Sequence, residues 1–161
     1  MFVVVMGVSG SGKTTVGRLL AERMGCAFYD GDDYHPPANR EKMAAGIPLT
    51  DADRTGWLAA LAELIRAALN KDSSGVLACS ALKEKYRAVL RLDPERVRFV
   101  FLRGSYDLIL VRMQARGDHY MKPGMLQSQF EALEEPAGTL VEDIRQPPEA
   151  IVEDILVHLG T

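Results

Sequence analysis

Gly7-Val8-Ser9-Gly10-Ser11-Gly12-Lys13-Thr14 is the stretch of this sequence that decides its fold. It matches the pattern G-x-x-x-x-G-K-[ST] at every fixed position. The apolar, β-branched run at residues 2–6 precedes it and is typical of a buried parallel strand. Residues 14–24 follow with apolar side chains at helical spacing, so strand, glycine-rich turn and helix come in direct succession. This order predicts a phosphate-binding loop in an α/β protein.

Such a loop binds nucleotides because its backbone N–H groups converge on phosphate oxygens at the start of the helix. The Lys13 ammonium is expected to reach the β- and γ-phosphates, and the Thr14 hydroxyl to bind Mg²⁺. The sequence therefore predicts a nucleotide site with Mg²⁺, formed by Gly7, Ser9, Gly10, Ser11, Gly12, Lys13, Thr14 and Thr15.

Composition limits what else the chain can be. Its 161 residues predict one domain, 1–161, and 25% charged with 47% hydrophobic residues is ordinary for a globular protein. The net charge of −3 provides no basic field for nucleic acid. No apolar run approaches about 18 residues, so neither a membrane span nor a signal peptide is expected. Two cysteines, Cys26 and Cys79, are too few for a disulfide framework, and we expect a cytoplasmic protein.

Strand and helix patterns alternate along the chain, which favours a parallel sheet with helices on both faces. Strands are expected at residues 2–6, 27–30, 75–79, 97–102 and 139–141. Helices are expected at residues 14–24, 40–45, 51–70, 83–92, 106–115 and 125–133, and from 147 onward. Two insertions follow strand ends, a substrate-binding segment at about 31–70 and a lid at about 116–133. Segments after the carboxyl ends of strands border the ligand crevice in such folds.

Candidate chemistry begins in the first insertion. Asp30 and Asp32 follow the second expected strand, and one could hold a Mg²⁺-bound water while the other accepts a proton from a substrate hydroxyl. An acidic turn without a catalytic role is the alternative. Further along, His35 is more commonly structural than catalytic, as lone loop histidines are. Lys42 and Arg54 are either solvated or ligands for an anionic group.

Polar and basic residues also follow the third and fourth strands. Ser80 could bind substrate or Mg²⁺-bound water, or cap a helix. Lys83 and Arg87 share a helix turn and could clamp a carboxylate, or line a solvated face. Arg112 and Arg116, one turn apart before the lid, could stabilise charge on the γ-phosphate and stack on an adenine ring.

Taken in order, these residues resemble the gluconate kinase family of small bacterial-type gluconokinases. The matching pieces extend over nearly the whole chain: Met6 to Lys13; Asp30-Gly31-Asp32 with His35-Pro36; Asn39; Lys42-Met43; Pro48-Leu49 followed by Asp51, Asp53-Arg54 and Trp57-Leu58; Cys79-Ser80-Ala81-Leu82-Lys83 with Tyr86-Arg87; Arg112, Arg116 and His119; and Ser128-Gln129-Phe130 with Leu133-Glu134 and Pro136. The pieces at residues 30–36 and 79–83 are far more specific than the phosphate loop.

The resemblance implies a reaction in which ATP and D-gluconate give ADP and 6-phosphogluconate, with Mg²⁺. It implies a three-layer P-loop fold like that of the nucleoside-monophosphate kinases, with five parallel strands in the order 2-3-1-4-5. It suggests a homodimer, although no pattern in the sequence marks an interface.

The resemblance also assigns residues to roles. Catalysis would fall to Lys13, Asp32 and Arg116, and the metal to Thr14 and Asp30. Nucleotide contacts beyond the loop would come from Arg112, Arg116, Gln146 and Pro147. Gluconate contacts would come from Asp32, His35, Lys42, Arg54, Ser80, Lys83, Arg87 and Gln129.

Two other functions are compatible with the phosphate loop. A shikimate-kinase-like enzyme also has paired aspartates after the second strand, but Ser80-Ala81-Leu82 stands here where a Gly-Gly-Gly run is expected. A nucleotide-dependent switch that transfers no phosphate to a metabolite is the second, although the chain lacks an Asn-Lys-x-Asp guanine signature.

Overall fold

A single parallel sheet organises the computed structural model, which describes residues 1–116 and 123–160. Its strands are β1 (Phe2–Met6), β2 (Ala27–Asp30), β3 (Gly75–Ala78), β4 (Val97–Arg103) and β5 (Leu140–Asp143). They lie in the order β2-β3-β1-β4-β5, and β1 pairs in parallel with both β3 and β4. This confirms the predicted sheet and its strand order.

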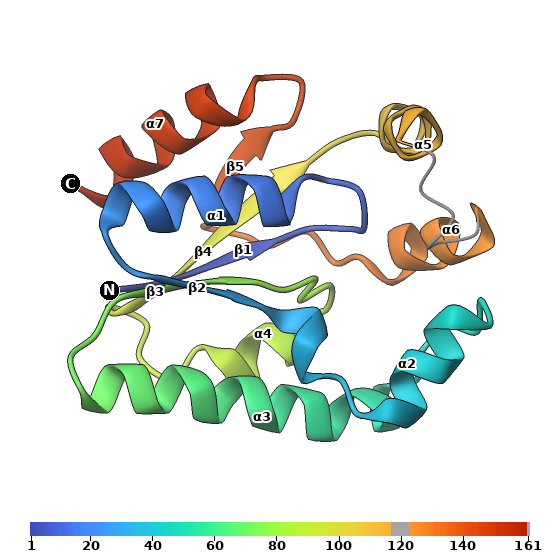
Figure 1. The fold of residues 1–161 in the computed structure, drawn as a ribbon, viewed down its shortest axis with the longest axis horizontal. Helices are drawn as coiled ribbons and strands as arrows, with labels where there is room; N and C mark the ends of the chain where they lie inside the picture. Colours follow the sequence, from blue (N-terminus) through green and yellow to red (C-terminus); the bar gives the residue numbers. More distant parts are fainter. Residues whose placement is uncertain (117–122, 161) are drawn as a thin grey trace.

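Seven helices and one short 3₁₀ turn are found in the described residues. They are α1 (Lys13–Met24), the 3₁₀ turn η1 (Gly31–Tyr34), α2 (Pro37–Ala44), α3 (Asp51–Asn70), α4 (Glu84–Leu90), α5 (Tyr106–Ala115), α6 (Pro123–Ala132) and α7 (Pro148–Leu159). Helices α1 and α7 cover one face of the sheet, and α3 and α4 cover the other (Figure 1). None of these helices combines the length and hydropathy needed to cross a bilayer.

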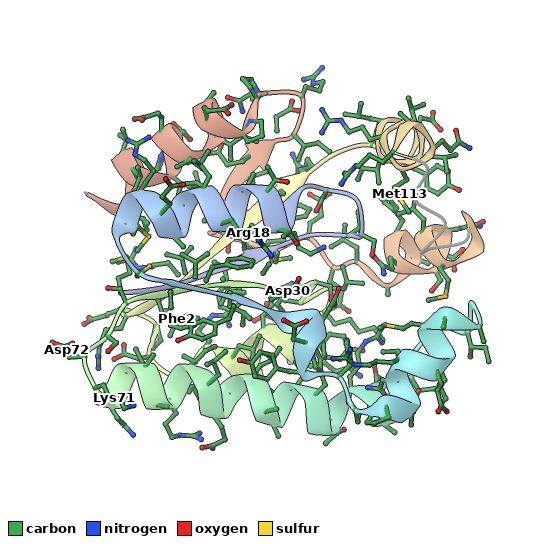
Figure 2. All side chains as sticks on the ribbon, in the orientation of Figure 1. Phe2, Arg18, Asp30, Lys71, Asp72 and Met113 are labelled. Carbon is green, nitrogen blue, oxygen red and sulfur yellow. The ribbon has the colours of Figure 1, made fainter. Side chains whose placement is uncertain are left out.

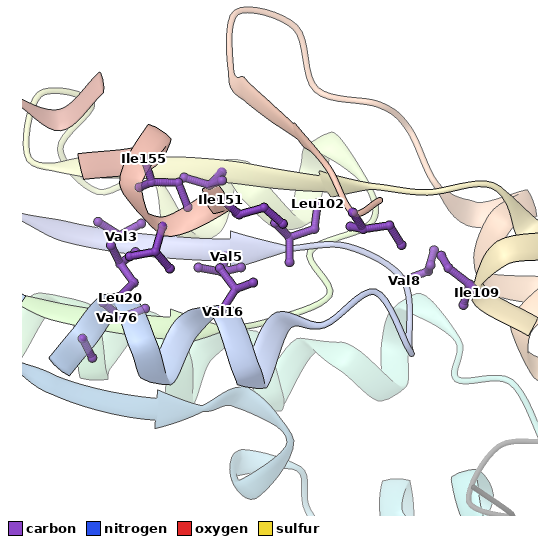
Figure 3. Packing of buried hydrophobic residues seen from close by; sticks show 14 of the residues in the cluster. Val3, Val5, Val8, Val16, Leu20, Val76, Leu102, Ile109, Ile151 and Ile155 are labelled. Atoms are coloured by element: carbon purple, nitrogen blue, oxygen red, sulfur yellow. The ribbon is translucent and has the colours of Figure 1, made fainter. Parts of the chain in front are cut away.

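The central strand β1 is buried on both faces, as its apolar run predicted. Val3 and Val5 pack among side chains of α1 and α7, including Leu20 and Ile155 (Figure 3). Phe2, Val4 and Met6 of the same strand face the α3 layer instead. Because successive strand residues point to opposite faces, one strand anchors both cores and fixes where the loop after it emerges.

Helix α3 provides the second core through Trp57, Leu61 and Ile65, which are at most 1% exposed. Their spacing of four residues places them on one face of the helix. Full burial of each such side chain contributes about 1.5–3 kcal/mol. At its start, Thr50 and Asp53 form a reciprocal capping box, which fixes the entry of the chain into α3.

Element boundaries differ from the predictions mainly where proline starts a helix. Helix α2 begins at Pro37 instead of residue 40, and α6 begins at Pro123 instead of residue 125. Proline favours the first helical turn because its missing N–H has no partner there in any helix. Strand β5 extends to Asp143, two residues beyond the expected end. Of the predicted lid at 116–133, residues 117–122 lie outside the described residues.

Helices α2, α5 and α6 gather beyond the carboxyl ends of the strands, on the right of Figure 1. The turn between β1 and α1 emerges at the same end of the sheet. Parallel α/β sheets bind ligands at this end. The fold therefore brings both predicted insertions to the phosphate loop.

Glu142 is a buried carboxyl group between β5 and α7. It points from β5 to the α7 side, where it is 2% exposed, and Asp154 of α7 lies within hydrogen-bonding reach. Burial, followed by Asp154, raises the pKa of Glu142 to about 7. The folded chain therefore holds a proton on Glu142 at a pH where the unfolded chain has released it.

Glu142→Gln should make the stability of the protein less dependent on pH. In the parent chain the raised pKa makes the free energy of unfolding fall as pH rises from about 5 to about 8, by up to about 3 kcal/mol. The amide cannot ionise, so the stability of the variant relative to the parent should increase as pH rises. Thermal unfolding from pH 5 to pH 8 measures this, with Glu22→Gln, an exposed carboxylate on α1, as the control. Parallel curves for parent and Glu142→Gln would contradict the prediction.

Candidate active site

The phosphate loop is held in a shape that requires glycine. Gly10 and Gly12 have φ angles of +77° and +97°, in the region that side-chain-bearing residues avoid. A Cβ at Gly10 would also lie 2.8 Å from Cγ of Met113, which Figure 2 shows on α5. Lys13 Nζ donates to the carbonyls of Gly7 and Val8 at 3.0 and 2.9 Å, so its side chain folds back over the loop.

A first cavity of about 190 Å³ opens beside the loop. It joins loop residues to the acidic turn after β2 and to the end of α5, and its lining is Ser9, Gly10, Gly12, Lys13, Thr14, Thr15, Asp30, Asp32, Ala78, Met113 and Arg116. The structure thus brings together most of the predicted phosphate and metal ligands. Gly7 and Ser11 belong to the loop but do not line the cavity, and Ser11 is 2% exposed.

The other predicted nucleotide contacts lie along the loop between β5 and α7. Gln146 donates to the Asp143 carbonyl at 3.2 Å, and Pro147 precedes the first turn of α7. Arg112 reaches the same loop from α5 and donates to the carbonyl of Ile144 at 2.6 Å. None of these three predicted residues lines the first cavity, so contact with an adenine ring stays a prediction.

A second cavity lies on the other side of Lys13. Its lining is Ser9, Lys13, Asp32, His35, Met43, Pro48, Leu49, Arg54, Trp57, Ser80, Leu82, Met125, Ser128 and Gln129. Three of these residues, Ser9, Lys13 and Asp32, also line the first cavity. The two cavities therefore meet at a lysine and a carboxylate.

The acidic turn separates its carboxylates by position. Asp30 Oδ1 accepts the backbone N–H of Asp32 at 3.0 Å and so caps the 3₁₀ turn. Desolvation, and more weakly the charges of Asp32 and Asp33, raises the pKa of Asp30. Asp32 lines both cavities, Asp30 lines only the first, and Asp33 lines neither. Asp32 is therefore the carboxylate at the junction of the two cavities.

The predicted cations are distributed unevenly. Among the residues that the structure describes, Lys13 and Arg54 are the only lysine or arginine side chains lining the second cavity. Arg54 is held by the Leu49 carbonyl at 2.8 Å and the Tyr86 hydroxyl at 3.1 Å. Lys42 instead pairs with Asp53 at 2.8 Å, and Lys83 lies 3.2 Å from Asp51, both off the cavity wall.

Arg87 requires a correction, because its position does not fit the predicted contact with a substrate carboxylate. Its side chain is only 1% exposed, and it donates to the carbonyls of Ala81 and Glu134, each at 2.7 Å. Ala81 has a φ angle of +45°, a strained conformation for a residue with a side chain. Arg87 therefore supports the turn after β3, and through it the position of Ser80.

Helix α6 docks directly on the phosphate loop through Gln129. Its Oε1 accepts the backbone N–H of Ser9 at 2.7 Å, and its Nε2 donates to the Ser9 hydroxyl at 3.1 Å. Ser80 contributes from the opposite side, where its carbonyl accepts the Gly7 N–H at 3.3 Å. Both predicted substrate residues line the second cavity.

Asn39 and Trp57 are among the residues that resemble the gluconate kinase family, but sequence reasoning assigned neither of them a role in the site. Trp57 lines the second cavity and stacks on His35 with ring centroids 4.3 Å apart. Asn39 is 3% exposed and lies 3.1 Å from Nδ1 of His35. Their place in the pieces that resemble the family is the signal that could have indicated a role in the site.

Comparisons with known proteins agree with this geometry. The shikimate kinase family model matches residues 9–159. The thermosensitive gluconokinase of Escherichia coli K12 is 47% identical over 142 residues, covering 88% of this chain and 76% of that protein. The gluconokinase of Gluconobacter oxydans 621H is 43% identical over 98% of this chain and 90% of its own.

Solved structures of kinases are also similar to this chain. The crystal structure of a gluconokinase from Sinorhizobium meliloti 1021 matches with a TM-score of 0.89 at 47% identity, over 98% of this chain and 90% of that one. An APS kinase from Mycobacterium tuberculosis, in complex with AMPPNP and APS, matches at 0.70 with 19% identity and shows a shared fold.

Proposed function

Because this chain belongs to the gluconokinase family, we propose that it transfers the γ-phosphate of ATP to D-gluconate, giving ADP and 6-phospho-D-gluconate. The observation that carries the proposal is the junction of two cavities at Lys13 and Asp32. Phosphoryl transfer needs a donor and an acceptor in line, with a cation and a base between them. The two-cavity arrangement supplies both groups at one place.

In the proposed reaction the 6-hydroxyl oxygen of gluconate attacks the γ-phosphorus while the bond to the β,γ-bridging oxygen breaks. Asp32 accepts the hydroxyl proton, and ADP leaves with the bridging oxygen. Lys13 and Arg116 balance the negative charge on the transferred group. The electron pair of the broken bond stays on ADP, so charge moves toward the loop and its N–H groups.

The first cavity offers a donor set that fits Mg²⁺. The Thr14 hydroxyl and the Asp30 carboxylate both line it, and Mg²⁺ prefers such oxygen ligands, commonly with several waters retained. Bound there, the ion would neutralise part of the charge on the phosphates. We assign Thr14 and Asp30 to hold it.

Transfer to gluconate is tested by incubating the protein with ATP, Mg²⁺ and a panel of acids that includes gluconate, other sugar acids and shikimate. Phosphorus NMR should show a new phosphomonoester on the 6-carbon of gluconate. Preference for shikimate by orders of magnitude would replace the proposal with the shikimate-kinase alternative. Nucleotide binding without any phosphorylated acid would favour the non-catalytic switch.

Arg54→Met should raise the KM for gluconate by about 10- to 100-fold with a much smaller change in kcat, because a charged hydrogen bond to the carboxylate contributes about 1.5–3 kcal/mol. Steady-state kinetics with gluconate varied at saturating ATP measure this. Lys42→Met and Lys83→Met are matched controls, since neither lysine lines the cavity. If Lys83→Met raised the KM for gluconate more than Arg54→Met did, the carboxylate of gluconate would have to bind at the start of α4 instead.

We place the activity in the cytoplasm, where ATP is available and the free thiols of Cys26 and Cys79 stay reduced. The proposed partner is gluconate alone, with no role for nucleic acid or membrane. A homodimer remains a prediction for sedimentation velocity to test.

A further inference from the structure

His35 is fixed in an environment that leaves its ring little freedom. It is 7% exposed, and its ring stacks on Trp57 with a centroid distance of 4.3 Å and an interplanar angle of 13°. Trp57 is itself held by a hydrogen bond from Nε1 to the Gly31 carbonyl at 2.7 Å. The plane of the imidazole is therefore tied to the same turn that carries Asp30 and Asp32.

Asn39 settles which nitrogen of this imidazole bears the proton. Its Nδ2 lies 2.8 Å from the Asp53 carbonyl oxygen and 3.1 Å from Nδ1 of His35. A carbonyl only accepts, so the atom facing Asp53 is the NH₂ group of the amide. The same NH₂ faces Nδ1, which must then accept. A neutral ring in this arrangement carries its hydrogen on Nε2.

Charges around the ring keep it neutral. Burial, then the charge of Arg54 from α3 and that of Arg40 from α2, lowers the pKa of His35 to about 4. Arg40 also donates to the His35 carbonyl at 3.3 Å. The remaining charged groups on the cavity wall, Lys13 and Asp32, are of opposite sign. Above about pH 5 the imidazole is uncharged, with one donor and one acceptor nitrogen.

The donor nitrogen remains available to a ligand. His35 lines the second cavity, and within residues 1–116 and 123–160 its Nε2 makes no hydrogen bond to another protein atom. We propose that Asn39 is a positioning residue that holds His35 as the Nε2–H tautomer, and that this N–H donates to an oxygen of the sugar acid in the second cavity. The second half of this inference rests on the proposed function; the first half does not.

Arg54 and His35 give the second cavity two different kinds of hydrogen-bond donor. Arg54 offers a permanent charge suited to a carboxylate, whereas the neutral Nε2–H is suited to a hydroxyl oxygen. A site that donates to a particular hydroxyl discriminates strongly against analogues that lack it, because its own donor is then left unpaired. Asn39 would thus affect which acid is accepted without touching it.

The tautomer is tested first on the ligand-free parent protein by ¹⁵N NMR of labelled histidine. The chain has three histidines, and His35→Gln identifies the signal of His35. The expected spectrum shows a protonated Nε2 and an unprotonated Nδ1, unchanged from about pH 5.5 to about pH 8. A hydrogen on Nδ1, or a charged ring at pH 6.5, would overturn the proposal whatever the enzyme phosphorylates.

Asn39→Asp tests the link to the substrate. The introduced carboxylate accepts from Nδ1–H, so it raises the pKa of His35 and reverses the neutral tautomer. The variant should keep the Nε2 donor only while the ring is charged. Its kcat/KM for gluconate, relative to the parent, should fall about tenfold as pH rises through the new pKa.

A purely structural role of Asn39 would lower that ratio equally at every pH, which would overturn the proposal. In the His35→Gln background Asn39→Asp should lose its pH dependence, because no imidazole remains to titrate. Persistence of the pH dependence there would also contradict it. Thermal unfolding of each variant shows that folded protein is being compared.

Discussion

Replacing Asp32 with asparagine will lower kcat for gluconate phosphorylation by at least about 100-fold while leaving ATP binding nearly intact. The amide keeps the size of the side chain but cannot take the proton of the attacking hydroxyl. Asp32 lines both cavities, so its loss acts where donor and acceptor meet. Single-turnover kinetics measure the chemical step, and calorimetry with a non-hydrolysable ATP analogue measures binding.

Asp33→Asn is the matched control for this experiment. It removes the same charge from the same 3₁₀ turn, but Asp33 lines neither cavity, so kcat should change less than about threefold. Asp30→Asn should weaken the apparent affinity for Mg²⁺ more than it slows the chemical step. If Asp32→Asn turned over normally and Asp30→Asn did not, the roles of the two carboxylates would be reversed.

The fold was predictable because its signals are local and repeated. The alternation of residues 2–6 between two cores, the helical spacing of Trp57, Leu61 and Ile65, and the glycines of the loop each specify backbone geometry directly. The strand order came from the resemblance to gluconate kinases, because periodicity does not say which strands are neighbours. The predicted starts of helices α2 and α6 were less accurate, because a proline begins each helix before its apolar pattern does.

The site was harder, because spacing shows only which residues share a helix face. Lys83 and Arg87 lie one turn apart, which suggested a clamp, but Arg87 turns inward to the carbonyls of Ala81 and Glu134. The Glu134 carbonyl is distant from Arg87 in the sequence, and the Ala81 carbonyl belongs to a residue in a strained backbone conformation. Neither property produces a recognisable pattern in the sequence. Arg54, weakly indicated as one of several cations, is the one that the packing of α3 and Tyr86 directs to the cavity.

Asn39 and Trp57 show a related limit. Buried polar groups require partners, but which partners they find depends on how helices α2 and α3 pack against the turn after β2. From the sequence alone, a structural role for His35 was the more common expectation for a lone histidine in a loop. The structure gives it both a structural setting and an open nitrogen, a combination that no single position in the sequence could reveal.

Lys13→Met should lower kcat/KM by about 1000-fold, the upper end of what removal of one preorganised donor costs, because it deletes a full charge from a desolvated site. Burial lowers the pKa of Lys13, and the carboxylates of Asp32 and Asp30 oppose that shift. The positive charge of Lys13 acts to lower the pKa of Asp30. Removing that charge should therefore raise the pKa of Asp30 further.

Methionine preserves most of the length of the Lys13 side chain, so the loop should keep its shape, with water donating to the carbonyls of Gly7 and Val8 in place of the ammonium. Lys71→Met, an exposed charge at the far end of α3, is the control and should leave kcat/KM unchanged. Retention of activity within tenfold in Lys13→Met would mean that Arg116 and the backbone N–H groups suffice to stabilise the transferred phosphate. The catalytic charge would then lie at the end of α5 and not in the loop.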